Sequence, residues 1–189
     1  MNTLFPLVNE FLPPGFIYEK NFISRQQETD LVKLIEQIEL KNLAFQGYQA
    51  KRKVASFGLD WSFDSRRLTK GKDIPFEFSS IVGQVSDYLN ISSADLAEVL
   101  VTEYPAGSVI NWHRDAPPFE MIAGLSLLSD CLFKLRPHDK SKHLRKNVIS
   151  VPLRPRSLYV LKGPSRSDWE HSIAPVKSKR YSITFRTLK

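Results

Sequence analysis

The hydrophobic and polar positions follow two different periods, which divide the chain into a helical first part and a stranded second part. Residues 24–40 predict a helix, because apolar side chains recur there at helical spacing and form one stripe. Ser24 is its expected N-cap, with Gln27 at the capping-box position. The apolar stripe consists of Leu31, Leu34, Ile35 and Ile38. A second helix is predicted over 78–89, and Ser93 is the expected cap of a third, short one.

From residue 98 onward, the pattern changes to short runs of β-branched and aromatic residues separated by Pro, Gly and Asp. The predicted strands are 98–104, 108–112, 121–128, 131–135, 148–153, 157–161, 172–176 and 181–186. The earlier segment 44–68 is rich in aromatic residues and predicts a β-hairpin. Helices followed by many short strands predict an α+β fold, an antiparallel sandwich or jelly roll with the helices packed on one sheet.

Composition narrows the class of protein. The 189 residues are 42% hydrophobic, which is enough to form the core of one domain. We expect this single domain to span residues 1–189. No apolar run approaches the roughly 20 residues of a membrane span, and the N-terminus lacks the basic start of a signal peptide. Cys131 is the only cysteine, which excludes an intrachain disulfide and a thiolate metal cage. We expect a cytoplasmic, monomeric protein without membrane contact.

A net charge of +7 favours an anionic partner, and nucleic acid is the partner that we expect. Ordinary solubility charge is the alternative. The stretch 136–147 is rich in lysine and arginine, and we expect a solvated loop there.

The triplet His113-Arg114-Asp115 places a histidine and a carboxylate two residues apart, so on an extended strand both point to the same face. His171 could supply a third ligand from a facing strand. Two histidines and one carboxylate leave open positions that suit Fe(II), a co-substrate and oxygen. Taken alone, the triplet is also compatible with a structural hydrogen-bonded pair or a zinc hydrolase. Other histidines that could compete as ligands are His138 and His143.

The last strand predicts where a co-substrate binds. Its alternation puts Arg180, Ser182, Thr184 and Arg186 on one face. Buried guanidinium groups require anions, and a dicarboxylate such as 2-oxoglutarate supplies one carboxylate to arginine and its keto-acid end to iron. The alternative is that these residues form the solvent-facing side of an edge strand.

With these residues in view, the chain resembles the AlkB-type Fe(II)/2-oxoglutarate dioxygenases over most of its length, from about residue 14 to residue 189. The resemblance rests on 101–107, on the H-x-D triplet at 113–115, on Glu170-His171 and on the paired Arg180 and Arg186. It implies a double-stranded β-helix, a jelly-roll variant, with the substrate-covering lid in the hairpin region 44–72.

The resemblance also implies roles for individual residues. His113, Asp115 and His171 would be the catalytic iron ligands. Arg180 would pair with the distal carboxylate of 2-oxoglutarate and Tyr104 would add a hydrogen bond. Arg186 would lie near the other carboxylate and Asp115, and Ser182 and Thr184 share that face and would line the pocket. The cofactor would be Fe(II), with 2-oxoglutarate and oxygen as co-substrates.

For the substrate, the resemblance implies oxidative demethylation of N-alkylated bases in DNA or RNA. Substrate contacts are expected from the hairpin region, which contains both basic stretches and aromatic side chains. They are Arg52, Phe57, Trp61, Phe63 and Arg66.

Two departures from the family pattern bear on the substrate. Thr102 stands where the repair enzymes usually carry asparagine, and Pro117 stands where they often carry a carboxylate that reads the base. The first alternative is therefore the same oxygenase chemistry on a protein side chain or small molecule. The second is a non-catalytic module that binds nucleic acid.

Overall fold

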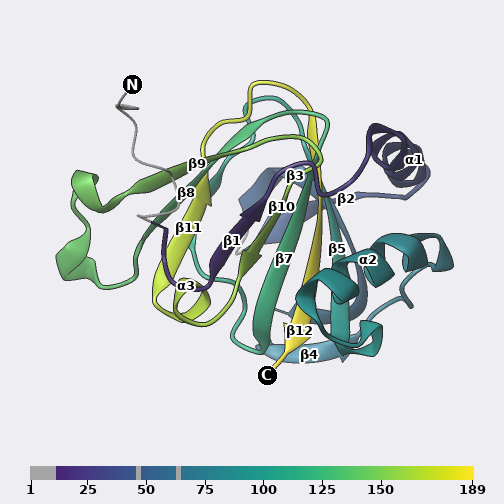
Figure 1. Cartoon of the computed structure of the whole chain (residues 1–189), viewed down its shortest axis with the longest axis horizontal. Helices are drawn as coiled ribbons and strands as arrows, with labels where there is room; N and C mark the ends of the chain where they lie inside the picture. The colour runs from purple at the N-terminus through teal and green to yellow at the C-terminus, as the bar shows by residue number, and fades with distance from the viewer. Residues whose placement is uncertain (1–11, 46–47, 63–64) are drawn as a thin grey trace, which may run out of the picture.

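The computed structural model describes residues 12–189 except 46–47 and 63–64, and shows two antiparallel sheets that face each other (Figure 1). The larger sheet has eight strands in the order β1-β10-β7-β12-β5-β3-β2, with β4 paired to β3. These strands are β1 (Phe16–Glu19), β2 (Lys41–Phe45), β3 (Tyr48–Ser62), β4 (Arg67–Lys70), β5 (Leu96–Tyr104), β7 (Phe119–Leu127), β10 (Leu158–Leu161) and β12 (Arg180–Leu188). The smaller sheet has the order β6-β11-β8-β9. Its strands are β6 (Ile110–His113), β8 (Cys131–Pro137), β9 (Ile149–Leu153) and β11 (Trp169–Ile173).

The helices begin and end largely where the sequence predicts. Helix α1 (Arg25–Glu36) has the predicted capping box, with Ser24 and Gln27 bonding each other's backbone N–H groups. Helix α2 (Ser79–Leu89) ends at Asn90, which adopts the left-handed conformation. The predicted third helix is a single 3₁₀ turn, Ser93–Asp95, and Ser92 rather than Ser93 caps it. Other short helical turns are Phe76–Phe78, Lys140–Lys142, Arg145–Asn147 and α3 (Pro164–Ser167).

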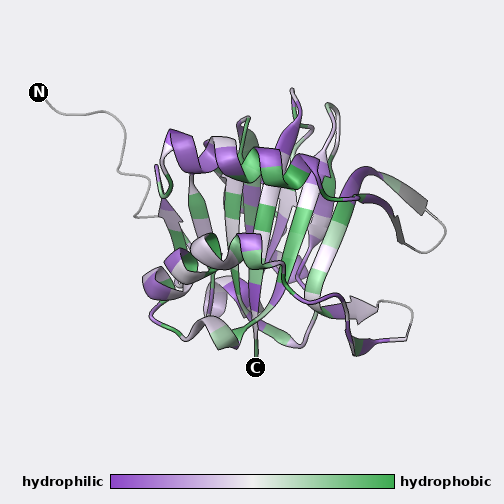
Figure 2. Ribbon diagram, turned by 90° about the vertical axis from the view of Figure 1, so that its right-hand side faces the viewer, coloured by the Kyte–Doolittle hydropathy of each residue, from purple (hydrophilic) through white to green (hydrophobic). Residues whose placement is uncertain are grey.

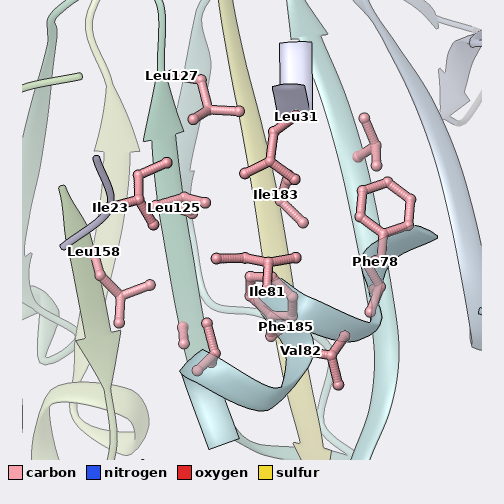
Figure 3. Packing of buried hydrophobic residues seen from close by; sticks show 14 of the residues in the cluster. Ile23, Leu31, Phe78, Ile81, Val82, Leu125, Leu127, Leu158, Ile183 and Phe185 are labelled. Carbon is pink, nitrogen blue, oxygen red and sulfur yellow. The ribbon is translucent and has the colours of Figure 1, made fainter. Parts of the chain in front are cut away.

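Helices α1 and α2 cover one face of the larger sheet, with their polar sides outward (Figure 2). Ile35 of α1 and Val85 of α2 are fully buried in the same cluster as Ile183 and Phe185 of β12. Figure 3 shows the same core from close by, with Leu31 of α1 and Ile81 of α2 beside Ile183 of β12. The apolar stripes read from the sequence therefore form the helix-side core, and the predicted α+β jelly-roll fold is confirmed.

Strand β12 lies in the middle of the larger sheet, between β5 and β7. Arg180 is paired with Tyr104 and Arg186 with Glu98. The alternative in which Arg180 and Arg186 belong to an edge strand facing solvent is therefore wrong. As predicted, the two faces of β12 differ in chemistry. Tyr181, Ile183 and Phe185 enter the helix-side core, and the polar residues from Arg180 to Arg186 face the smaller sheet.

The predicted strand 172–176 is displaced, since β11 covers Trp169–Ile173 and therefore includes His171. The predicted hairpin 44–68 is a set of three strands, β2, β3 and β4. Gly58 lies inside β3 with φ of +86°, and a Cβ there would come within 2.3 Å of the Ala97 carbonyl oxygen. Glycine is therefore required where β3 bends, and the bend changes which face its side chains occupy. Among the described residues, no helix is long and apolar enough to cross a membrane.

Replacing Ile35 by alanine tests the contact between α1 and the sheet. We expect Ile35→Ala to lower the free energy of unfolding by about 2–5 kcal/mol, because it leaves a cavity in the helix-side core. Urea unfolding followed by circular dichroism measures the change. Lys33→Ala, at an exposed position of the same helix, should change it by less than about 0.5 kcal/mol. Equal effects of the two substitutions would contradict this packing.

Candidate metal centre and active site

The structure brings together His113, Asp115 and His171. His113 ends β6 and is paired directly with His171 of β11, while Asp115 follows two residues after His113. One ligand atom of each residue lies within 4.8 Å of the others. His113 donates from Nδ1 to the Asn111 carbonyl at 2.8 Å, which leaves its Nε2 lone pair for an ion. The side chains of His113 and Asp115 thus converge as the H-x-D spacing predicts, although Asp115 lies beyond the end of β6.

The unpaired oxygen of Asp115 shows that the three residues fit a metal ion. Its Oδ1 accepts a hydrogen bond from Arg186 at 2.7 Å. Its Oδ2 is buried, lies 3.5 Å from His171 Nε2, and has no hydrogen-bond partner among the described residues. A buried carboxylate oxygen without a partner is costly, and a cation between these atoms would satisfy it.

The competing histidines lie elsewhere. His138 contacts Glu170 at 3.1 Å and His143 contacts the Pro137 carbonyl at 3.0 Å. In the described part of the chain, His113, Asp115 and His171 are the one group of three or more such ligands close enough to hold a metal.

The protonation states suit metal binding. Burial raises the pKa of Asp115, but Arg186, helped by His171 and His113, outweighs it and holds that pKa well below its usual range. Burial and the neighbouring His113 lower the pKa of His171 to about 3, although Asp115 opposes them. At neutral pH, Asp115 is therefore an anion and His171 is neutral, the states in which each can ligate a metal ion.

Arg186 lies between two acids. Its Nη2 donates to Asp115, and its Nη1 donates to Glu98 at 2.6 Å. Glu98 is only 2% exposed and also accepts a hydrogen bond from Ser56 at 2.9 Å. Sequence reasoning missed Glu98, although strand alternation from Tyr104 and Thr102 places it on the same inner face.

Arg180 has the environment expected for a carboxylate-binding group. It is 1% exposed, its Nε donates to Ser126 at 3.1 Å, and its guanidinium lies 4.8 Å from the centre of the Tyr104 ring. Its Nη1 is buried without a hydrogen-bond partner among the described residues. Ser182 donates to the Tyr104 hydroxyl at 3.5 Å. A bound carboxylate would pair with Nη1 of Arg180.

Thr184 is also buried and lies one strand position beyond Ser182 on the same face, so it lines the interior as expected. Thr102, which departs from the family pattern, is paired with Ser182 and is 4% exposed. Its hydroxyl therefore lies on the same interior wall.

A second arginine that sequence reasoning missed holds the loop after Asp115. Nη2 of Arg166, on α3, donates to the carbonyls of Asp115, Ala116 and Phe119 at 3.2, 2.8 and 2.9 Å. Three backbone carbonyls on one guanidinium fix the loop that follows Asp115. No sequence pattern signals this contact, because it depends on how α3 packs.

The expected substrate residues separate into different environments. Phe57 is 6% exposed and packs in the helix-side core near Phe78, so the prediction that it contacts substrate is wrong. Trp61, beyond the bend at Gly58, packs against the interior cluster that contains Tyr104 and Phe119. Arg66 is exposed and has positive φ.

Arg52 lies on the same side of β3 as Ser56, the partner of Glu98, and its Nε is buried without a described partner. It therefore belongs to the interior wall, as expected of a binding residue. Phe63 lies outside the described residues.

Comparison with known proteins agrees with this site. Residues 15–186 match the sequence profile of the 2OG-Fe(II) oxygenase superfamily, so the chain belongs to that superfamily. Membership of this superfamily implies Fe(II), with 2-oxoglutarate and oxygen as co-substrates. The side chains of His113, Asp115 and His171 fit the metal, and Arg180 fits a carboxylate. The relatives place the chain among the AlkB-type members, which confirms the resemblance read from the sequence.

Two curated relatives and one solved structure illustrate the likeness. The mouse protein named tRNA (carboxymethyluridine(34)-5-O)-methyltransferase ALKBH8 is 29% identical over 174 residues, which cover 89% of this chain and 25% of that protein. An Arabidopsis thaliana protein named alkylated DNA repair protein ALKBH8 homolog is 25% identical, covering 93% and 59% respectively. The structure of OsALKBH1 matches the fold with a TM-score of 0.73 at 17% identity, covering 94% of this chain and 98% of that one. The chain thus spans about a quarter of the mouse relative.

Replacing Glu98 by glutamine tests the buried ion pair. We expect Glu98→Gln to lower the free energy of unfolding of the metal-free protein by about 3 kcal/mol, because the Arg186 charge then loses one of its two anions. Urea unfolding measures this. The control, Glu103→Gln, changes an acid on the opposite face of the same strand that pairs with surface lysines, and should cost at most about 1 kcal/mol. A smaller effect at Glu98 than at Glu103 would rule out this role.

Proposed function

We propose that this chain is an Fe(II)/2-oxoglutarate-dependent dioxygenase that oxidatively removes alkyl groups from nitrogen atoms of nucleic-acid bases. His113, Asp115 and His171 would hold the iron. Arg180 and Tyr104 would bind the distal carboxylate of 2-oxoglutarate. The observation that carries the proposal is a pair of buried orphan atoms, Asp115 Oδ2 and Arg180 Nη1, one suited to a cation and the other to a carboxylate.

When bound, the iron and 2-oxoglutarate would supply an oxidation reaction. 2-Oxoglutarate and oxygen are converted to succinate and CO2, and a C–H bond of the substrate becomes C–OH. On an N-methyl group the product loses formaldehyde. The chain's own residues position the reactants. Arg186 holds Asp115 in one orientation, and Arg166 fixes the loop beside it. Phe133 stacks on the His171 ring at 5.2 Å and keeps it in place.

A nucleic-acid substrate is supported by the net charge of +7 and by the relatives, whose names refer to tRNA and to alkylated DNA. The β3–β4 hairpin, with Trp61 and the exposed Arg66, is the proposed substrate lid. Arg52 on the interior wall could contact a phosphate or base, as protein groups do around a flipped nucleotide.

The connection between β8 and β9 adds a basic surface beside the metal centre. His171 is paired with Leu135, and β8 ends two residues later at Pro137, so the connection leaves the smaller sheet at the end that carries the ligands. In Figure 1 it projects beyond the sandwich. Its charges are Lys140, Lys142, Arg145 and Lys146 against Asp139, which the Lys142 ammonium already neighbours at 3.6 Å.

Pro117 favours a second candidate, the same chemistry on a protein side chain or small molecule. It lies two residues after Asp115 and is exposed, and its ring cannot accept a hydrogen bond from a base. Succinate formation stimulated by a protein or small-molecule fraction but by no nucleic acid would favour this candidate.

The deciding assay incubates the protein with methylated DNA and RNA oligonucleotides, iron(II), 2-oxoglutarate and oxygen. We expect formaldehyde and succinate in equal amounts from at least one methylated base. His171→Ala should reduce both by at least about a hundredfold, because it removes a proposed ligand. Succinate formed without substrate measures uncoupled turnover. Full activity of His171→Ala would exclude the proposed centre, and absence of formaldehyde from every oligonucleotide would exclude base demethylation.

The basic connection predicts a salt-dependent effect. We expect Arg145→Gln/Lys146→Gln to weaken binding of a single-stranded oligonucleotide and to reduce the slope of log K against log salt by about 1 to 2 units, since two phosphate contacts are lost. Fluorescence anisotropy at several salt concentrations measures the slope. The matched control, Arg25→Gln/Lys33→Gln, removes the same charge from α1. An equal reduction in both variants would show that net charge alone is responsible.

A further inference from the structure

Tyr159 of β10 lies inside the sandwich, on the wall that carries the proposed 2-oxoglutarate site. It is paired with Gly124 of β7, and Gly124 is paired in turn with Thr184 of β12. Figure 1 shows these three strands side by side. The tyrosine is 9% exposed, and its ring packs at 4.8 Å from Phe133, which stacks on His171.

The position of the Tyr159 hydroxyl follows from Gly124. A Cβ on Gly124 would lie 2.2 Å from Cε1, 2.3 Å from Cζ and 2.6 Å from the hydroxyl oxygen of Tyr159. The ring therefore crosses β7 and rests on bare backbone, where any other residue would displace it. Its hydroxyl ends one strand away from β12, and adjacent strands are about 4.8 Å apart. Strand β12 is the strand that carries Arg180 and Arg186.

The Tyr159 hydroxyl has no hydrogen-bond partner among the described residues. Tyr159 makes no side-chain hydrogen bond to another described residue, whereas neighbouring hydroxyls do: Ser126 accepts from Arg180, and Ser182 donates to Tyr104. Burial, together with Asp115 and Tyr104, raises the pKa of Tyr159, so the phenol keeps its proton and can donate. With no partner among the described residues, the hydroxyl is free to donate to a ligand.

We infer that Tyr159 binds the co-substrate, with its hydroxyl donating a hydrogen bond to a carboxylate of bound 2-oxoglutarate, and that Gly124 is required to admit its ring. The inference rests on the proposed function, because it assigns one further contact to the same site. Sequence reasoning had no reason to select either residue, since one is a strand tyrosine and the other a strand glycine.

The test is Tyr159→Phe, which keeps the ring and removes only the hydroxyl. Anaerobic titration of the iron(II) protein with 2-oxoglutarate, followed by visible charge-transfer absorption, measures affinity without turnover. We expect the Kd for 2-oxoglutarate to rise about tenfold or more, since the lost bond ends on a charged group. The thermal midpoint of the metal-free protein should not fall. Tyr18→Phe is the control, because that hydroxyl bonds Pro152 and Arg154 backbone groups instead, and its Kd should be unchanged.

Gly124 gives a second, independent measurement. Gly124→Ala should raise the Kd and lower the thermal midpoint, because the new methyl collides with the Tyr159 ring. In Gly124→Ala/Tyr159→Leu the collision is removed, so the midpoint should recover while the Kd stays as high as in Tyr159→Phe. Recovery of affinity in this double variant, which has no hydroxyl, would overturn the inference.

The wild-type titration separates the two proposals. If wild-type protein gives no charge-transfer absorption with iron(II) and 2-oxoglutarate, the proposed function fails. If wild type gives the absorption and Tyr159→Phe binds 2-oxoglutarate equally well, the proposed function stands and the role of Tyr159 is refuted.

Discussion

The interior of this sandwich holds charged side chains away from water, and the structure of the site depends on how these charges are paired. Glu98, Arg186 and Asp115 form a continuous row in which one guanidinium serves two carboxylates. Each of these charges would be costly alone, and the pairing is what makes the row affordable in a protein interior. Because Arg186 occupies only one oxygen of Asp115, the other stays directed at His171. The ion pairs thus leave the second oxygen of Asp115 without a positive partner, and a metal ion fits between this oxygen and His171.

Much of the fold and the ligand set could be predicted because they depend on local periodicity. An H-x-D triplet on an extended backbone must present both side chains on one face, and β12 alternates polar and apolar residues from Arg180 to Arg186. The α1 capping box is equally local. Glu98 could have been found by the same alternation counted backward from Tyr104.

Other features could not be predicted because they depend on contacts distant in sequence. Phe57 and Trp61 lie four residues apart, yet the bend at Gly58 sends one to the helix-side core and the other to the interior. Arg166 reaches carbonyls about 50 residues earlier in the chain. The pairing of Tyr159 with Gly124 exists only after β10 and β7 align. None of these contacts has a signature in hydrophobic period or composition.

The site is divided between the two sheets, and this division affects how long the protein survives in the cell. The histidines come from the smaller sheet and the arginines from the larger one. Bound iron and 2-oxoglutarate would therefore hold the two sheets together. Any opening that separates the sheets would release both ligands. Since ligands that bind only the folded state stabilise it in proportion to their occupancy, protein made during iron scarcity would open more often and be degraded sooner. Cellular abundance of the enzyme would then follow the supply of iron and 2-oxoglutarate without any dedicated regulator.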